Sequence, residues 1–115
     1  MASRDTIREV LSSSQLSVDS EKALQNQIEQ LFKDRNIPYE REAKVAQGFI
    51  DFLCGDVGIE VKVKGSKRAI YRQCKGYMED DRINSILVVS NQALALPPTI
   101  NGKIAEVISL GEAWL

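Results

Sequence analysis

The chain has 115 residues, of which 43% are hydrophobic and 27% charged, and its formal net charge is -1. This length and composition are typical of a globular domain with one hydrophobic core, and they exclude a disordered or fibrous chain. The sequence contains no histidine and its two cysteines form no CxxC pair, which excludes a histidine base, a Ser-His-Asp triad and the usual zinc sites.

The N-terminal third of the chain predicts two helices. Asp5 is placed to cap a short helix over residues 5–11. Apolar residues then recur at helical spacing over residues 17–35, which predicts a longer helix with Ser17 or Asp19 as its N-cap.

Three strands are expected next, because the apolar residues change from helical spacing to alternation or to short runs. The strands cover residues 39–45, 49–54 and 58–64, and residues 55–58 form a turn between the last two. These segments therefore predict an antiparallel hairpin in the middle of the chain.

The second half of the chain predicts one more helix and two more strands. Ser66 is placed to cap a helix that runs to about Asp81. The aliphatic run at residues 85–90 is typical of a buried strand, and residues 103–110 form another strand after an Asn-Gly turn. The order of elements indicates an α/β fold, a mixed sheet flanked by helices, with a single domain over residues 1–115.

The predicted hairpin over residues 49–64 carries the clearest chemical signal. Side chains alternate between the faces of a strand, so Glu60 and Lys62 share a face. If the turn is centred directly after Gly55, Asp51 lies opposite Glu60, whereas a shift by one residue would place this acid among valines. Two facing carboxylates repel each other and attract a cation, and Mg²⁺ prefers such oxygen ligands.

An acid pair with a nearby lysine is also compatible with a simpler interpretation. Lys62 can form a surface salt bridge with Asp51 or Glu60 on the solvated face of an amphipathic hairpin, and such pairs are common and weak. The surroundings of Asp51 favour a functional site, because this acid interrupts the apolar run at residues 49–53, where an unpaired carboxylate is costly.

Asp51, a gap of eight residues and then Glu60-Val61-Lys62 resemble the D…(D/E)XK motif of the PD-(D/E)XK nuclease superfamily. The order of elements from residue 17 to residue 90 resembles the αβββαβ core of that superfamily. Within that superfamily, the chain resembles the compact members of the VRR-NUC and Holliday-junction-resolvase-like types. Ile50 stands where the namesake motif has proline, a residue that supplies no ligand.

The resemblance implies a role for each residue of the motif. Asp51 and Glu60 are expected to be metal ligands, the Val61 carbonyl a further ligand, and Lys62 the catalytic lysine. The implied cofactor is Mg²⁺, with Mn²⁺ as a substitute, and the implied reaction is the hydrolysis of a phosphodiester by an activated water.

The resemblance extends to both helices beside the hairpin. Glu21 corresponds to a carboxylate of the first helix that often assists metal binding, with Glu29 as the alternative in another register. Gln73 and Tyr77 resemble the Q…Y pair on the helix after the motif. Each has a structural alternative: an acid that stabilises a helix N-terminus, and a core tyrosine beside a satisfied glutamine.

Cations cluster directly after the motif. From Lys62 to Lys75 the sequence contains six lysines and arginines and no acid. We expect five of them to contact nucleic acid, namely Lys64, Lys67, Arg68, Arg72 and Lys75. The alternative is a solvated helix face.

These observations lead to one expected function and two alternatives. The chain is expected to be a Mg²⁺-dependent endodeoxyribonuclease acting on DNA, with RNA as an alternative substrate. A narrower alternative is a resolvase of branched DNA that acts as a homodimer, and another is a non-catalytic nucleic-acid-binding module. The polar N-terminus and the lack of a long apolar run predict a cytoplasmic protein with no membrane partner, in which residues 1–16 are weakly specified.

Overall fold

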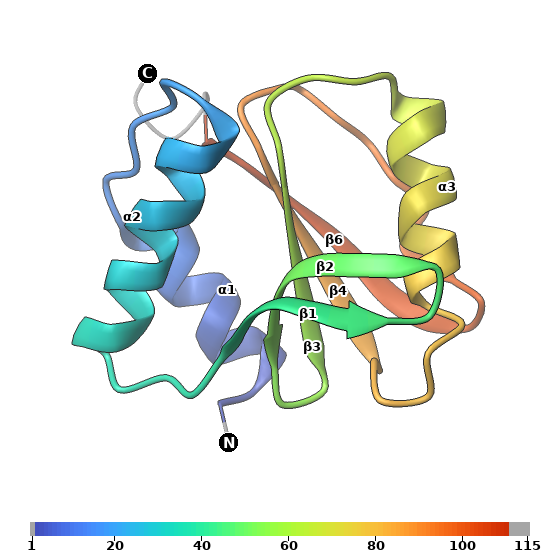
Figure 1. Cartoon of the computed structure of the whole chain (residues 1–115). Coiled ribbons are helices and arrows are strands. Elements are labelled where there is room, and N and C mark those ends of the chain that lie inside the picture. Colours follow the sequence, from blue (N-terminus) through green and yellow to red (C-terminus); the bar gives the residue numbers. More distant parts are fainter. Residues whose placement is uncertain (1, 111–115) are drawn as a thin grey trace.

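The computed structural model describes residues 2–110, which form a mixed six-stranded sheet and three helices (Figure 1). The expected domain also includes residues 1 and 111–115, which lie outside the described part. The elements follow the order α1 (Arg4–Ser13), α2 (Glu21–Asp34), β1 (Glu40–Val45), β2 (Gly48–Cys54), β3 (Val57–Lys62), α3 (Lys67–Tyr77), β4 (Ser85–Ser90), β5 (Thr99–Ile100) and β6 (Lys103–Ser109). The predicted α/β class is confirmed, together with every helix and strand that the sequence predicts.

The strands lie in the order β1-β2-β3-β4-β6-β5. The first three are antiparallel neighbours, whereas β3, β4 and β6 run parallel to one another and β5 pairs antiparallel with β6. All six residues of β4 are buried, as expected for a parallel strand in the centre of a sheet. Helix α3 makes the crossover that joins the parallel neighbours β3 and β4.

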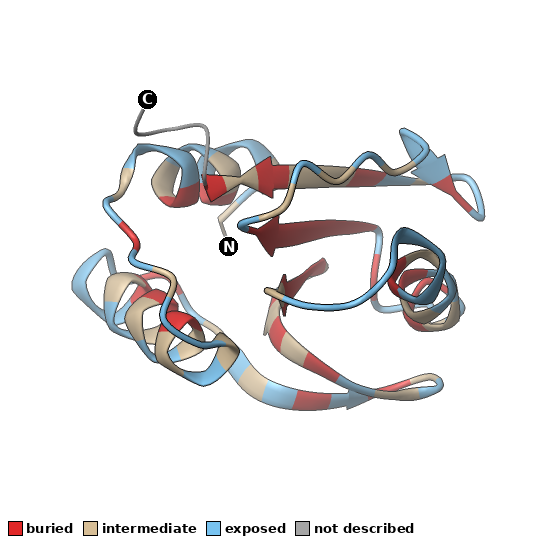
Figure 2. Ribbon diagram, turned by 90° about the horizontal axis from the view of Figure 1, so that it is seen from above, coloured by how far each residue is buried: buried red, intermediate tan, exposed pale blue. Residues whose placement is uncertain are grey.

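Helices cover both faces of the sheet, so the molecule has two hydrophobic cores. Helices α1 and α2 lie on one side of the sheet and α3 lies on the other, with the buried strands β3 and β4 between them (Figures 1 and 2). We call these the α1/α2 core and the α3 core. The first includes Ile59 and Val61 of β3, and the second includes Ile86 and Val88 of β4.

The predicted N-caps of the first two helices are wrong by a few residues. Ser3, not Asp5, caps α1 and accepts a hydrogen bond from a backbone N–H three residues later. Ser20, not Ser17 or Asp19, caps α2 in the same way. Serine and aspartate are both good caps, so local preference alone does not choose among several in a row.

Helix α3 begins as predicted but ends earlier. Ser66 is its N-cap, while its last residue is Tyr77 and not Asp81. The chain leaves the helix because the Asp80 carboxylate bonds to Arg82 and to the Ala46 N–H instead of facing solvent on a further helical turn.

Two differences concern the strands. Strand β3 ends at Lys62, two residues before the predicted end, because the N–H of Val63 donates to the Glu21 carboxylate and not to a neighbouring strand. The sequence did not predict β5, which has only two residues and therefore no pattern to recognise. No helix within residues 2–110 is long and apolar enough to cross a membrane.

Candidate active site

Strands β2 and β3 form a tight antiparallel hairpin around Gly55. Phe52 pairs with Ile59, so the same alignment taken one step further places Asp51 opposite Glu60. Gly55 adopts a φ of 61°, a left-handed conformation that glycine accepts without steric cost. This is the register that the alternation of the sequence predicted.

The two facing acids replace the regular backbone bonds of the hairpin. The N–H of Asp51 donates to Glu60 Oε1 at 3.1 Å, and the N–H of Val61 donates to Asp51 Oδ2 at 2.7 Å. Each carboxylate thus accepts a hydrogen bond from the backbone of the opposite strand. These two hydrogen bonds fix both carboxylates directly beyond the Phe52–Ile59 pair, where the regular pairing of β2 with β3 stops.

Strand β2 changes face at Asp51. Strict alternation would place Ile50 and Phe52 on one face, but Ile50 packs in the α3 core and Phe52 packs in the α1/α2 core. The neighbouring strand is irregular at the same level, since Glu42 of β1 has a φ of 52°. The twist in both strands accompanies the turn of the Asp51 carboxylate toward β3.

Lys62 and Glu21 lie beside the facing acids. Lys62 Nζ is 3.3 Å from Glu60 Oε2, and Glu21 Oε1 accepts the N–H of Val63 at 3.0 Å. Glu21 is the first residue of α2, so the start of that helix meets the end of β3. The alternative carboxylate Glu29 is used elsewhere, because it bonds to the side chains of Tyr39 and Arg41.

The surface-salt-bridge interpretation requires Glu60 to lie on a solvated face, but this residue is buried. Only 3% of its surface is exposed, although its partner Lys62 keeps 20% of its side chain in contact with solvent. A carboxylate in such a place is costly unless it is paired, protonated or bound to a cation. The arrangement is therefore a buried glutamate that faces a half-buried aspartate, with a lysine at the edge of the pair.

Burial raises the pKa of both facing carboxyl groups. The pKa of Glu60 rises to about 8, mainly because the group is removed from water and next because the Asp51 charge lies beside it. The pKa of Asp51 is also raised by burial, against the lowering effect of the hydrogen bond from Val61. Near neutral pH the pair therefore retains a proton that a cation would have to displace.

Gln73 and Tyr77 connect α3 to the hairpin. Gln73 Nε2 donates to the Tyr77 hydroxyl at 2.8 Å, and this hydroxyl donates to the Phe49 carbonyl at 2.7 Å. Burial, followed by the nearby Glu60 charge, raises the pKa of Tyr77. Within the described residues neither side chain bonds to a carboxylate, so the pair holds β2 in position two residues before Asp51.

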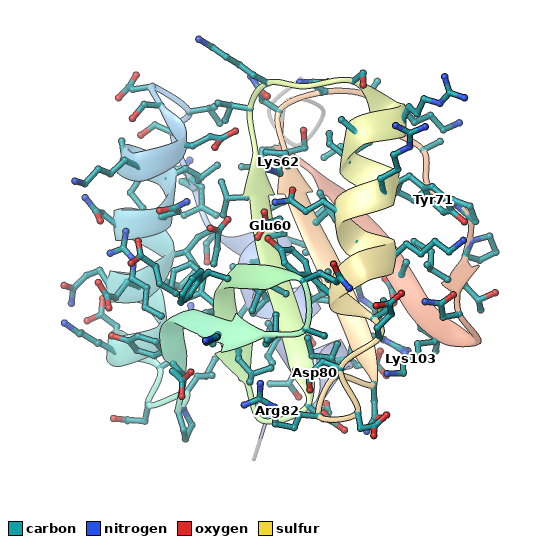
Figure 3. All side chains as sticks on the ribbon, turned by 45° about the vertical axis from the view of Figure 1, so that its right-hand side comes forward. Glu60, Lys62, Tyr71, Asp80, Arg82 and Lys103 are labelled. Atoms are coloured by element: carbon teal, nitrogen blue, oxygen red, sulfur yellow. The ribbon has the colours of Figure 1, made fainter. Side chains whose placement is uncertain are left out.

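A second hairpin, formed by β1 and β2, is held against the end of α3 by residues that the sequence did not single out. Asp80 Oδ2 accepts the N–H of Ala46 at 2.9 Å and also bonds to Arg82, whose guanidinium donates to the Lys44 carbonyl at 2.6 Å. Lys103 donates to the carbonyl of Asp80 at 2.9 Å from the other side (Figure 3). The bonds from Arg82 hold the pKa of the Asp80 carboxyl well below its usual range. Asp80 stands in a run of acids, so no sequence signal distinguished it.

The predicted nucleic-acid contacts lie on the outside of the molecule. They are all exposed, and none of them takes part in an ion pair within residues 2–110: Lys64, Lys67, Arg68, Arg72 and Lys75. Helix α3 contains no acid at all. Its cations therefore form an exposed positive surface that begins near Lys62.

The donor chemistry of the acid pair fits Mg²⁺. In the described part of the chain, no three His, Cys, Asp or Glu side chains are arranged as a metal-binding group. Mg²⁺ does not need such a group, because it keeps several waters and is usually held by one or two carboxylates together with substrate phosphate. Asp51 and Glu60 provide two carboxylates of this kind, and Glu21 lies nearby as a third acid.

Comparison of the chain with protein-family models, with curated proteins and with solved structures finds no match.

Proposed function

We propose that the protein is a Mg²⁺-dependent endodeoxyribonuclease with a core of the PD-(D/E)XK type. The observation that carries this proposal is the pair of Asp51 and the buried Glu60. Each carboxylate accepts a backbone N–H from the opposite strand, at 2.7 Å for Asp51 and 3.1 Å for Glu60, and Lys62 lies 3.3 Å from Glu60. Two carboxylates this close together attract a cation, and two carboxylate oxygens are the ligands that Mg²⁺ prefers.

The arrangement of the elements supports the proposed core. Helix α2 precedes three antiparallel strands, α3 follows, and β4 returns parallel to β3. This matches the αβββαβ order of the superfamily. In this assignment α1, β5 and β6 are additions to the core, and the acid pair lies on its second and third strands.

The residues that would hold the cation are Asp51, Glu60 and the Val61 carbonyl, with Glu21 as an auxiliary acid. When bound, Mg²⁺ would supply Lewis-acid polarisation of a phosphate oxygen and a water of lowered pKa. The reaction is the attack of water on phosphorus with cleavage of one P–O bond, which gives an alcohol and a phosphate monoester.

Lys62 has a separate part in the proposed reaction. Its ammonium group lies at the exposed edge of the acid pair, where it can orient the attacking water and offset the negative charge that builds up on the phosphate oxygens. Gln73 and Tyr77 act as positioning residues, because they fix the start of β2 through the Phe49 carbonyl.

The cations of α3 would bind the DNA backbone. Lysine and arginine side chains that form no ion pair with an acid attract DNA phosphates whatever the base sequence. The N-terminus of a helix favours anions as well. The exposed surface from Lys64 to Lys75 therefore supplies affinity without base specificity. A homodimer, with one site for each strand, would let such an enzyme cut both strands of a duplex.

The experiment that tests the proposal is a cleavage assay on a panel of substrates. Supercoiled plasmid, linear duplex, single-stranded, flap and four-way DNA are each incubated with Mg²⁺, with Mn²⁺ or with EDTA. We expect cleavage with either metal and none with EDTA. A lack of cleavage of every substrate would leave only a binding module, and cleavage that persists in EDTA would contradict the metal-dependent mechanism.

A further inference from the structure

A groove of about 640 Å³ lies on the surface beside α3. One wall consists of α3 residues and the other of the connection between β4 and β5, and the lining residues are Lys67, Arg68, Tyr71, Ala95, Leu96 and Pro97. Tyr71 lies on the side of α3 that faces away from Glu60 and Lys62 (Figure 3). A helix with its side chains is about 10 to 12 Å across, so the groove is next to the acid pair but separate from it.

The groove combines an apolar wall with free positive charge. Tyr71 and Leu96 are partly buried and pack against the α3 core, which fixes the ring in place. Lys67 and Arg68 are exposed, and neither forms an ion pair with any described residue. Neither α3 nor residues 91–98 contain an acid, so the ligand that complements this groove is an anion with a flat apolar part.

A nucleotide with an unpaired base has these properties. Its base presents a π-face that can stack on a tyrosine, and its phosphate pairs with lysine or arginine. A base inside a duplex is already stacked and offers no free face to a side chain. The spacing of the helix also suits a nucleic-acid strand, because Lys67, Tyr71 and Lys75 follow one another at intervals of one turn along α3.

We propose that this groove binds an unpaired nucleotide of the substrate, with the base against Tyr71 and Leu96 and the phosphate at Lys67 or Arg68. The inference rests on the proposed function and names the substrate class within it. The substrate is DNA in which a single-stranded segment adjoins the cleaved duplex, and the single strand passes over α3 away from the acid pair.

The test measures the binding of a fluorescent oligothymidylate of about twelve nucleotides by anisotropy, in EDTA so that no cleavage occurs. Tyr71→Ala should weaken binding by about 5- to 150-fold, since stacking on an aromatic side chain contributes about 1–3 kcal/mol per base. Tyr71→Phe retains the ring and should bind as the wild type does. Lys33→Ala removes an exposed cation of α2 and is the matched control.

A second variant keeps the test decisive if Tyr71→Ala fails to fold. Ala95 is exposed at the groove, so Ala95→Glu places a negative charge beside the phosphate without disturbing the core. This variant should also bind the oligothymidylate more weakly. In addition, a 4-thiothymidine oligonucleotide should crosslink to the α3 segment that contains Tyr71 or to the segment that contains Leu96.

Equal oligothymidylate affinity in the wild type, Tyr71→Ala and Ala95→Glu would overturn the inference, as would crosslinks confined to other segments. A polyglutamate peptide that competes at the same concentrations as oligothymidylate would assign the groove to an acidic peptide instead. These results are independent of catalysis. Metal-dependent cleavage with unchanged oligothymidylate binding contradicts this inference alone, whereas Tyr71-dependent binding without any cleavage contradicts the proposed function alone.

Discussion

Glu60 lies almost entirely out of water, and the charge nearest to it besides that of Lys62 is another carboxylate. Its 3% exposure and the neighbouring Asp51 raise its pKa to about 8. The folded protein thus holds a proton at Glu60 that the unfolded chain releases near the ordinary value of 4.5. A buried acid pair of this kind lowers the stability of the fold above that value, and a bound cation reverses the effect.

The first prediction concerns the pH dependence of stability in EDTA. A raised folded-state pKa contributes stability that is complete below the unfolded value and is lost as the pH rises through the folded value. Each pH unit between the two values removes about 1.4 kcal/mol. Glu60→Gln removes this dependence, so the variant should gain stability relative to the wild type between about pH 5 and pH 8. Urea unfolding at several pH values measures the difference.

The matched control for this prediction is Glu40→Gln, at an exposed position on β1. It should follow the wild-type pH dependence. Mg²⁺ should stabilise the wild type more at the upper end of the pH range than at the lower end, because it displaces a proton. Parallel curves for the wild type and Glu60→Gln would show that Glu60 is not the group that titrates.

The second prediction separates the chemical role of Lys62 from substrate binding. Lys62→Met should lower the single-turnover cleavage rate by about 10²- to 10³-fold, the usual effect of removing one group that stabilises transition-state charge. Affinity for DNA should fall only slightly, because Lys62 is one of six neighbouring cations. Lys33→Met, on α2, is the control and should retain the wild-type rate. If binding collapses while the rate of the bound complex is unchanged, Lys62 is only a phosphate contact.

The two sides of helix α3 have different roles, one in packing and one in the proposed binding of DNA. Its buried side carries Tyr77, which holds the start of β2, and its exposed side carries the cations. Arg68 and Arg72 are one turn apart on the exposed side, where they can meet the same stretch of phosphate backbone.

The third prediction tests this exposed side. Each phosphate contact contributes about -0.9 to the slope of log affinity against log salt for duplex DNA, so replacing Arg68 and Arg72 together by alanine should flatten the slope by roughly one to two units. Fluorescence anisotropy at several salt concentrations measures the slope. Replacing Lys33 of α2 together with Arg35, the C-cap of that helix, is the matched control. An unaltered slope for the α3 pair would leave its cations as a solvated helix face.

The fourth prediction concerns the attachment of the β1–β2 hairpin to the end of α3. Asp80→Ala removes the acceptor of the Ala46 N–H and the partner of Arg82, and should lower the free energy of unfolding by about 1–3 kcal/mol. Asp81→Ala, the exposed neighbour, should have little effect. Urea denaturation compares the two, and equal stabilities would show that the Asp80 carboxylate does not hold the hairpin in place.

Some features of the fold could be predicted from the sequence and others could not, for physical reasons. Hydrophobic periodicity predicted every long element, and the alternation in β3 predicted that Asp51 lies opposite Glu60. Periodicity could not predict that Ile50 and Phe52 point to opposite faces of the sheet. This change of face depends on α2 and α3 packing against different parts of β2. The groove at Tyr71 was missed for a similar reason, since its second wall comes from a connection without regular structure.

At the scale of the whole molecule, the candidate site is assembled from four elements that the sheet brings together. Glu21 comes from the start of α2, Asp51 from β2, Glu60 and Lys62 from β3, and Gln73 from α3. The N-terminal helix is joined to the last long strand, because Arg4 and Arg8 both pair with the Glu106 carboxylate. The site itself depends on α2 and α3 as well as on the β2–β3 hairpin, because Glu21 and Tyr77 bond to the strands of that hairpin or to the residue that follows it.

The central claim is that cleavage takes place at the pair of Asp51 and Glu60. The most direct measurement is the single-turnover rate of plasmid cleavage with Mg²⁺ by the wild type, Glu60→Gln and Asp51→Asn, with Asp19→Asn as the matched control on an exposed loop. We expect the control to cleave at the wild-type rate and each site variant to be slower by about 10²-fold or more, while both remain folded. A wild-type rate in either Glu60→Gln or Asp51→Asn would contradict the account, because the cleavage would then come from another place.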